Sequence, residues 1–166
     1  MSLTNLEDVF LDVLKDTLDA EKQILKALPK MAKGTESEEL KAAFEEHKTV
    51  TEKQVERLES VFKSINKAAR GKHCPGMEGL LEEGSELIKE EEAGPARDAA
   101  LICAAQKVEH YEIAAYGSLV TYAKMLGLKE AAKLLAETLK EEKDTDLALT
   151  KVASKLNFEA QQEDEE

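Results

Sequence analysis

The fold is decided by one stretch of the chain, Ala104-Ala-Gln-Lys-Val-Glu-His-Tyr-Glu-Ile-Ala-Ala-Tyr-Gly117. Its apolar residues recur at the spacing of a helix. Glu109 and Glu112 fall on the same stripe as Val108 and Tyr116. Residues three, four and seven positions apart share one face of a helix. The stretch therefore predicts a helix with two carboxylates on its buried face.

Helical periodicity extends in both directions from this stretch. We predict four long helices and one short one, over about Thr4–Lys33, Glu36–Ala69, Met77–Glu92, Gly94-Pro95 to Gly127, and Leu128–Leu156. Two capping boxes, Thr4-x-x-Glu7 and Thr35-x-x-Glu38, predict where the first two helices begin. The long helices therefore account for most of the chain.

The connections between these helices predict how they are arranged. The first and second long helices are joined by a short loop, and so are the third and fourth, so each pair forms an antiparallel hairpin. The connection between the hairpins is long and contains the short helix. This pattern predicts an all-α, ferritin-like four-helix bundle. A spectrin-like three-helix bundle and a simple up-down bundle are the alternatives. We expect one domain over residues 1–157 and a frayed, acidic tail over 158–166.

Composition excludes several classes of function. The chain has 166 residues and a net charge of −12, which repels nucleic-acid phosphates, so no nucleic-acid partner is expected. It contains no apolar run of about 18 residues and begins without a signal sequence, so we expect a cytoplasmic protein with no membrane partner. Cys74 and Cys103 form no Cys-x-x-Cys pair, which excludes a rubredoxin-type iron centre. Both are expected to be free, buried thiols.

The other long helices also carry polar residues on their apolar stripes. These are Glu21 in the first, His47 in the second, and Glu142 with Asp146 in the fourth. Glu21 and His47 lie about equally far from the turn that joins their helices, and Glu112 and Glu142 are equidistant from Gly127. At a rise of about 1.5 Å per residue, these groups fall within one layer of the bundle.

A layer of buried acids requires a physical explanation. Burying an ionised carboxylate costs several kcal/mol, and neighbouring carboxylates also repel one another. Divalent cations offset both costs, and oxygen ligands with one imidazole suit iron or manganese. We therefore predict a site for two metal ions, iron in the first place and manganese as the alternative, with the ligands Glu21, His47, Glu109, Glu112, Glu142 and Asp146.

Each of these residues also has a purely structural interpretation. Glu21 can be a half-buried acid at a packing edge, and His47 a hydrogen-bonded core histidine. Glu142 and Asp146 can form a solvated ridge, and Glu109 and Glu112 can face an oligomer interface. The coincidence of ionisable groups at one height on four helices favours the metal site. Tyr116 has two equal interpretations, a hydrogen-bond donor to the site or a core residue.

The chain resembles the YciF/YciE family of bacterial ferritin-like stress proteins from Leu6 to about Ala153. The segments that carry the resemblance are Asp19-Ala-Glu-Lys-Gln23, Ala43-Phe-x-x-His47, Met77-Glu-Gly-Leu80, Arg97-Asp-Ala-Ala-Leu101, Ala104–Gly117, Ala131-Ala-Lys-Leu-Leu135 and Glu141-Glu-x-x-x-Asp146. The resemblance implies a ferritin-like bundle, a homodimer, a di-iron centre and a link to stress responses.

The chain departs from the wider ferritin-like pattern, in which two helices carry Glu-x-x-His. Phe44 occupies the position three before His47, and Thr145 the position three after Glu142. Glu112 is the expected source of the missing carboxylate.

These observations leave three candidate functions. The first is a di-iron oxidoreductase or peroxidase-like protein, in which ferrous ions at the site react with peroxide or dioxygen. The second is a structural or interaction protein, in which the metal or polar core only stabilises a dimeric bundle. An iron-storage subunit is the third. Bound metal and its chemistry distinguish the first from the second.

Overall fold

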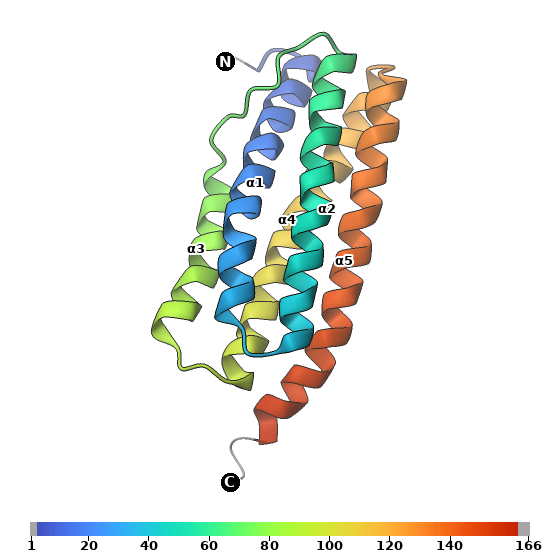
Figure 1. Ribbon diagram of the computed structural model, residues 1–166. Coiled ribbons are helices and arrows are strands. Elements are labelled where there is room, and N and C mark those ends of the chain that lie inside the picture. Colours follow the sequence, from blue (N-terminus) through green and yellow to red (C-terminus); the bar gives the residue numbers. More distant parts are fainter. Residues whose placement is uncertain (1–2, 163–166) are drawn as a thin grey trace.

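The computed structural model describes residues 3–162, and the chain in that range folds into five helices (Figure 1). They are α1 (Leu6–Gly34), α2 (Glu38–Ser64), α3 (Pro75–Glu90), α4 (Pro95–Met125) and α5 (Lys129–Gln162). The all-α prediction is confirmed, since α3 is the expected short helix and the other four are the long ones. Within the described range, no helix has the length and apolar character needed to cross a bilayer.

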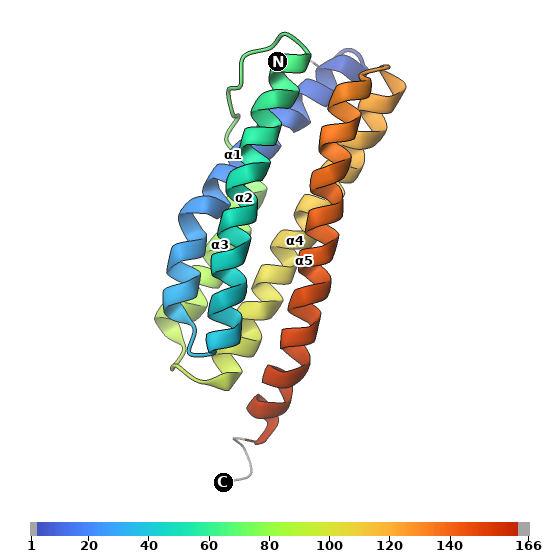
Figure 2. The same cartoon turned by 45° about the vertical axis from the view of Figure 1, so that its right-hand side comes forward.

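The four long helices form two antiparallel hairpins, α1 with α2 and α4 with α5 (Figures 1 and 2). The segment after α2 returns along α1, where the Lys72 backbone N–H donates to the Lys15 carbonyl at 3.0 Å. It then enters α3, which packs against α1 and α4 outside the four-helix core. Two hairpins joined by one long crossover are the predicted ferritin-like connectivity.

The first helix begins later than predicted. Asn5 is its N-cap, and the Asn5 Oδ1 accepts from the Asp8 backbone N–H at 2.9 Å. The Asp8 carboxylate reaches back to the backbone N–H and the hydroxyl of Thr4, at 3.0 and 2.6 Å. The predicted capping box of Thr4 with Glu7 is therefore wrong, because Asn5 and Asp8 satisfy the free N–H groups instead.

The second helix also begins later, and a distant residue explains why. Ser37 is its N-cap and accepts from the Leu40 N–H at 3.2 Å. The buried carboxylate of Asp98, at the start of α4, accepts from the backbone N–H groups of Glu36 and Ser37 at 3.0 and 2.7 Å. These contacts keep the backbone before Ser37 outside the helix. The predicted capping box that begins at Thr35 therefore does not form.

The helices α4 and α2 both end beside a residue with a positive φ. Gly127 has a φ of 71° and its neighbour Leu128 donates back to the Ala123 carbonyl, so α4 ends at Met125, two residues before the predicted end at Gly127. Asn66, with a φ of 55°, does the same for α2, where the Lys67 N–H donates to the Phe62 carbonyl at 3.0 Å. Asparagine tolerates this left-handed conformation. The α2 helix therefore ends at Ser64, before the predicted Ala69.

Two other expectations are corrected. The α5 helix continues to Gln162, past the predicted end at Leu156, so residues 158–162 of the expected frayed tail are helical; residues 163–166 lie outside the described range. The last turns of α5 extend beyond the end of the bundle (Figures 1 and 2). Cys74 is buried as expected, but Cys103 is exposed.

The apolar core is divided into two clusters. One cluster, towards the α1–α2 turn, includes Ile24, Leu28, Phe44, Leu101, Val108 and Leu149. The other, towards the α4–α5 turn, includes Phe10, Leu18, Leu58, Phe62, Leu119 and Leu135. Most of the buried polar residues of the long helices fall between the two clusters; they include Glu21, His47, Thr51, Gln54, Glu109, Glu112, Thr138 and Glu142. The bundle therefore has a polar layer between two apolar halves.

Candidate metal centre

Four of the predicted ligands converge in this polar layer. One ligand atom from each of His47, Glu109, Glu112 and Glu142 can be chosen so that all four lie within 4.8 Å of one another. The residues come from three helices, α2, α4 and α5, and all are buried. The height predicted from the sequence is thus the height at which these side chains meet.

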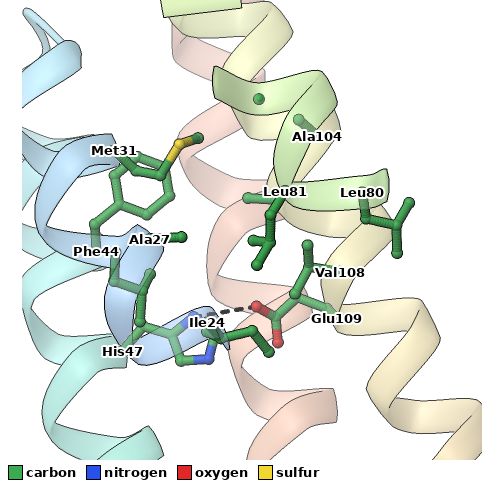
Figure 3. A pocket seen from close by; sticks show the side chains of 13 residues that line it. Ile24, Ala27, Met31, Phe44, His47, Leu80, Leu81, Ala104, Val108 and Glu109 are labelled. Atoms are coloured by element: carbon green, nitrogen blue, oxygen red, sulfur yellow. Dashed lines mark ion pairs between the residues drawn. The ribbon is translucent and has the colours of Figure 1, made fainter. Parts of the chain in front are cut away.

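Helical spacing and one contact orient the pair of acids on α4. Glu109 and Glu112 are three residues apart and share a face of that helix. The Nδ1 atom of His47 lies 3.2 Å from Glu109 Oε1, which links α2 to α4 (Figure 3). The Thr51 hydroxyl, one turn further along α2, donates to the His47 carbonyl at 2.9 Å. His47 is therefore placed with its second ring nitrogen free.

Glu21 enters the same layer from α1 and is fully buried. The hydroxyl of Tyr116 on α4 donates to Glu21 Oε1. This resolves the two interpretations of Tyr116, which is a fully buried residue and also a hydrogen-bond donor to the layer. The charge of Glu21 helps to raise the pKa of Glu112, so the two acids are near neighbours.

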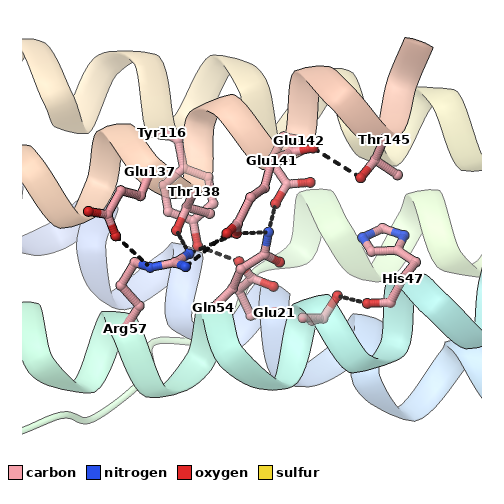
Figure 4. Close-up of polar contacts among 11 residues, drawn as sticks. Glu21, His47, Gln54, Arg57, Tyr116, Glu137, Thr138, Glu141, Glu142 and Thr145 are labelled. Carbon is pink, nitrogen blue, oxygen red and sulfur yellow. Dashed lines mark hydrogen bonds and ion pairs between the residues drawn. The ribbon is translucent and has the colours of Figure 1, made fainter. Parts of the chain in front are cut away.

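Gln54 belongs to the site, although it was not among the predicted ligands. Its Nε2 donates to Glu142 Oε1 and, at 3.2 Å, to Glu141 Oε2 (Figure 4). The Arg57 guanidinium donates two hydrogen bonds to the Glu141 carboxylate, at 2.8 and 2.9 Å. The signal in the sequence was a polar residue beside the apolar stripe, seven positions after His47. Gln54 thereby connects the buried layer to an ion pair at its rim.

The structure places Asp146 outside the cluster of four. Its Oδ1 accepts from Gln106 Nε2 at 3.1 Å and lies 3.5 Å from His110 Nε2. Asp146 lies one turn beyond Glu142 on α5. Its carboxylate there contacts the polar side chains of Gln106 and His110 on α4. His110 is largely exposed. Five of the six predicted ligands therefore share the layer, and Asp146 flanks it.

Many polar atoms in this layer have no hydrogen-bond partner outside the layer among residues 3–162. They are Glu21 Oε2, His47 Nε2, Gln54 Oε1, both carboxylate oxygens of Glu109 and of Glu112, and Glu142 Oε2. Buried polar atoms in native proteins are nearly always paired, and each exception calls for an explanation. All of these atoms are types that coordinate cations, and the carboxylate oxygens and the imidazole nitrogen are the types found in ferritin-like carboxylate sites.

Burial and mutual repulsion shift the pKa values of the acids. Desolvation, with the charge of Glu142, raises the pKa of Glu21 to about 8. Desolvation also raises the pKa of Glu142 to about 7, and the pKa values of Glu109 and Glu112 lie well above the ordinary value. Desolvation lowers the pKa of His47 to about 4. Without a cation, the layer therefore retains protons on its acids and keeps its imidazole neutral.

These properties fit a divalent metal. A neutral imidazole and carboxylate oxygens are the donor set found in ferritin-like carboxylate sites. Metal ions would replace the protons of the acids and give these oxygens partners. Glu21, His47, Glu109, Glu112 and Glu142 are the residues that would hold them.

A groove between α2 and α5 leads towards this layer. It has a volume of about 290 Å³, and His47 is among its lining residues. Glu46, Glu141 and Asp144 line it as well, together with Lys53. Glu141 is paired with Arg57 and Asp144 with Lys140, so the groove offers a polar approach to His47.

Comparison with known proteins identifies relatives over nearly the whole chain. Residues 5–162 match the family described as Domain of unknown function (DUF892). Protein YciF of Escherichia coli is 51% identical over 154 residues, which cover 92% of this chain and 93% of that protein. The crystal structure of the E. coli stress protein YciF superposes with a TM-score of 0.90 at 50% identity, covering 93% of this chain and 98% of that one.

A second solved structure is similar at lower identity. YcfI of Rhodopseudomonas palustris, named as a proposed structural protein, has a TM-score of 0.87 and 39% identity. The match covers 90% of this chain and 95% of that one. The fold is therefore shared across these relatives.

Proposed function

The chain belongs to the DUF892 family and is a relative of the stress protein YciF, as its sequence resemblance predicted, and on that premise we propose that it is a metal-binding, ferritin-like stress protein. It holds two metal ions, iron in the first place, in the polar layer between its two apolar clusters. When bound, ferrous ions would supply electrons to dioxygen or peroxide, which gives the protein a role in handling iron or oxidants.

One observation carries this proposal: six carboxylate oxygens and one imidazole nitrogen converge in one buried layer, and among residues 3–162 none of these seven atoms is hydrogen-bonded to a group outside the layer. A purely structural polar core would pair such atoms with amide, hydroxyl or backbone donors, because leaving one unpaired costs about 1–3 kcal/mol. Cations satisfy all of them at once and remove the repulsion between the acids. The cluster of His47, Glu109, Glu112 and Glu142 is the first metal position, and Glu21 extends it towards a second.

The residues of the chain have separate roles in this proposal. Glu109, Glu112 and Glu142 supply negative charge, and His47 supplies a neutral nitrogen. Tyr116 and Gln54 hold Glu21 and Glu142 in place through hydrogen bonds. The two apolar clusters on either side limit the access of bulk water.

The experiment is a measurement of metal stoichiometry. The protein is loaded anaerobically with ferrous iron, desalted and analysed for metal, and its optical spectrum is followed after peroxide is added. We expect about two irons per chain, as in other two-metal carboxylate sites, and a new near-ultraviolet band on oxidation. A folded protein that retains no metal would rule the proposal out and favour a structural or interaction protein with a metal-free polar core.

The homodimer implied by the family resemblance is also a proposal. Leu147 and Phe158 on α5 are large apolar side chains with more than half of their surface exposed, at 60% and 62%. Analytical ultracentrifugation of the purified protein distinguishes a dimer from a monomer of 18.3 kDa.

A further inference from the structure

A small cavity lies beside the acid layer, on the side away from the α2–α5 groove. Its volume is about 30 Å³, and it is lined by residues of α1, α2, α3 and α4 (Figure 3). Roughly 10–15 Å³ of such space is enough for one water molecule, so the cavity has room for a molecule of about two heavy atoms. It is too small for an organic substrate.

The walls of this cavity are almost entirely apolar. Met31 and Phe44 face Leu81 and Val108 across it (Figure 3). The crossover helix α3 covers it from outside with Leu80, Leu81 and Gly84. Apolar walls of this kind hold water weakly and favour small apolar molecules.

The only polar side chains that line the cavity are His47 and Glu109. Both belong to the proposed metal site, and the contact between them forms one end of the cavity (Figure 3). A molecule held in the cavity therefore lies next to the proposed metal ligands. His47 also lines the α2–α5 groove, so it lies between that polar groove and the apolar cavity.

We propose that this cavity is a binding site for a diatomic apolar gas, dioxygen, delivered to the metal layer under the cover of α3. The volume matches two heavy atoms, and the apolar walls favour a molecule that needs no hydrogen bonds. The role of the bound gas as a reactant rests on the proposed metal function, whereas the cavity's ability to bind an apolar gas does not.

Hydrogen peroxide has the same number of heavy atoms but is a poorer fit. Its two hydroxyl groups lose their hydrogen bonds to water on entering apolar surroundings, which is unfavourable. The α2–α5 groove, with its acids, Lys53 and Thr145, offers peroxide a polar approach instead. Closing the cavity should therefore slow the reaction with dioxygen and leave the reaction with peroxide unchanged.

Two glycines on α3 provide a matched pair of variants. A Cβ atom at Gly84 would lie 3.0 Å from Met31 Cε and 3.4 Å from its Sδ, so Gly84→Ala fills the cavity wall against a flexible side chain. A Cβ atom at Gly79 would meet nothing within 4 Å. Gly79→Ala therefore makes the same change in the same helix without touching the cavity.

The first test uses xenon as a probe for an apolar gas and requires no metal. Crystals of metal-free protein are pressurised with xenon, and anomalous scattering locates the bound atoms. We expect a xenon peak between Phe44, Leu81 and Val108, lost in Gly84→Ala and retained in Gly79→Ala. Ordered water in the cavity of the parent protein, or no xenon there, would overturn the proposal even if the protein binds iron.

The second test measures oxidation of ferrous-loaded protein by dioxygen and, separately, by hydrogen peroxide. We expect Gly84→Ala to lower only the rate with dioxygen, and Gly79→Ala to lower neither. Equal loss with both oxidants would overturn the selective role of the cavity. If no iron binds but xenon does, the proposed metal function fails and the gas site remains.

Discussion

The side-chain amide of Gln54 donates to Glu142 inside the acid layer and to Glu141 at its rim. Glu141 is in turn held by Arg57, whose guanidinium also donates to the Thr138 hydroxyl at 2.7 Å. A neutral amide thus occupies the position on α2 from which a carboxylate would also reach the layer. It supplies a donor to an acid and adds no negative charge.

Replacing this amide with an acid should destabilise the metal-free protein. Gln54→Glu places another carboxylate among buried acids, and we expect the free energy of unfolding at pH 8 to fall by about 1–3 kcal/mol. The loss should shrink at pH 5, where the acids bind protons, and on addition of Mn²⁺. Urea unfolding at both pH values measures it. Gln106→Glu, at a half-buried position that donates to Asp146, is the matched control; equal losses in the two variants would contradict the prediction.

Tyr116→Phe removes the hydroxyl that donates to Glu21. That hydrogen bond lowers the pKa of Glu21, which burial has raised to about 8. We expect the pKa of Glu21 in the metal-free variant to rise further and the free energy of unfolding to fall by about 1 kcal/mol. Carboxyl ¹³C chemical shifts of labelled protein report the titration. Tyr122→Phe removes a hydroxyl from the same helix and should leave the titration of Glu21 unchanged.

The metal-free protein should lose stability as the pH rises from 6.5 to 8. A buried acid with a raised pKa keeps its proton in the folded chain after the unfolded chain has lost it, near pH 4.5, so unfolding becomes easier until the folded pKa is passed. Each such acid contributes about 1.4 kcal/mol per pH unit. His47 acts oppositely, because its lowered pKa costs stability only as the pH falls from 6.5 towards 4.

Urea unfolding across this pH range measures the slope. Saturating Mn²⁺ should reverse it, because the metal displaces protons and binds more tightly as the pH rises. A metal-free protein whose stability is constant or increasing from pH 6.5 to 8 would show that the acids are already ionised in the folded state.

The combined change Glu109→Gln with Glu142→Gln should abolish stoichiometric iron binding and leave the helices intact. Glutamine keeps the size of each side chain and removes its charge, so the packing is retained while the metal loses two anionic ligands. Elemental analysis and far-ultraviolet circular dichroism measure the two outcomes. Glu56→Gln with Glu130→Gln, on exposed positions of α2 and α5, removes the same charge and should retain the iron.

Asp146→Asn tests whether the acid that flanks the cluster is a metal ligand. Because Asp146 already contacts Gln106 and His110, we expect this variant to keep its iron stoichiometry, with affinity reduced less than tenfold, or about 1.4 kcal/mol. Loss of one iron per chain would establish Asp146 as a ligand.

Local periodicity was sufficient to predict the helices, their pairing and the height of the acids. Glu21, His47, Glu109, Glu112 and Glu142 all lie on stripes that a helical projection identifies, and equal distances from two turns align them. The projection fixes the face of a helix but not the direction of a side chain on it. It therefore could not separate Glu142, inside the layer, from Asp146, one turn further on.

The ends of the helices depended on contacts that no local pattern contains. The sequence of Thr35 and Glu38 matches a capping box. The backbone N–H groups of that turn donate instead to the carboxylate of Asp98, which is more than 60 residues away in the sequence. The Gln54 bridge is another such contact, since it joins α2 to α5. Sequence periodicity identifies which residues are buried, and only the packed bundle determines their partners.

The contact of Asp98 with the α1–α2 turn sets an order of events during synthesis. The α1–α2 hairpin precedes α4 and α5 in the chain, so it leaves the ribosome first and can begin to fold first. Its turn retains two unpaired N–H groups until Asp98, at the start of α4, has been made and has docked. The first hairpin is therefore completed by the second. That docking fixes one hairpin lengthwise against the other, so the acids of α4 reach the level of His47 only when the last half of the chain is in place.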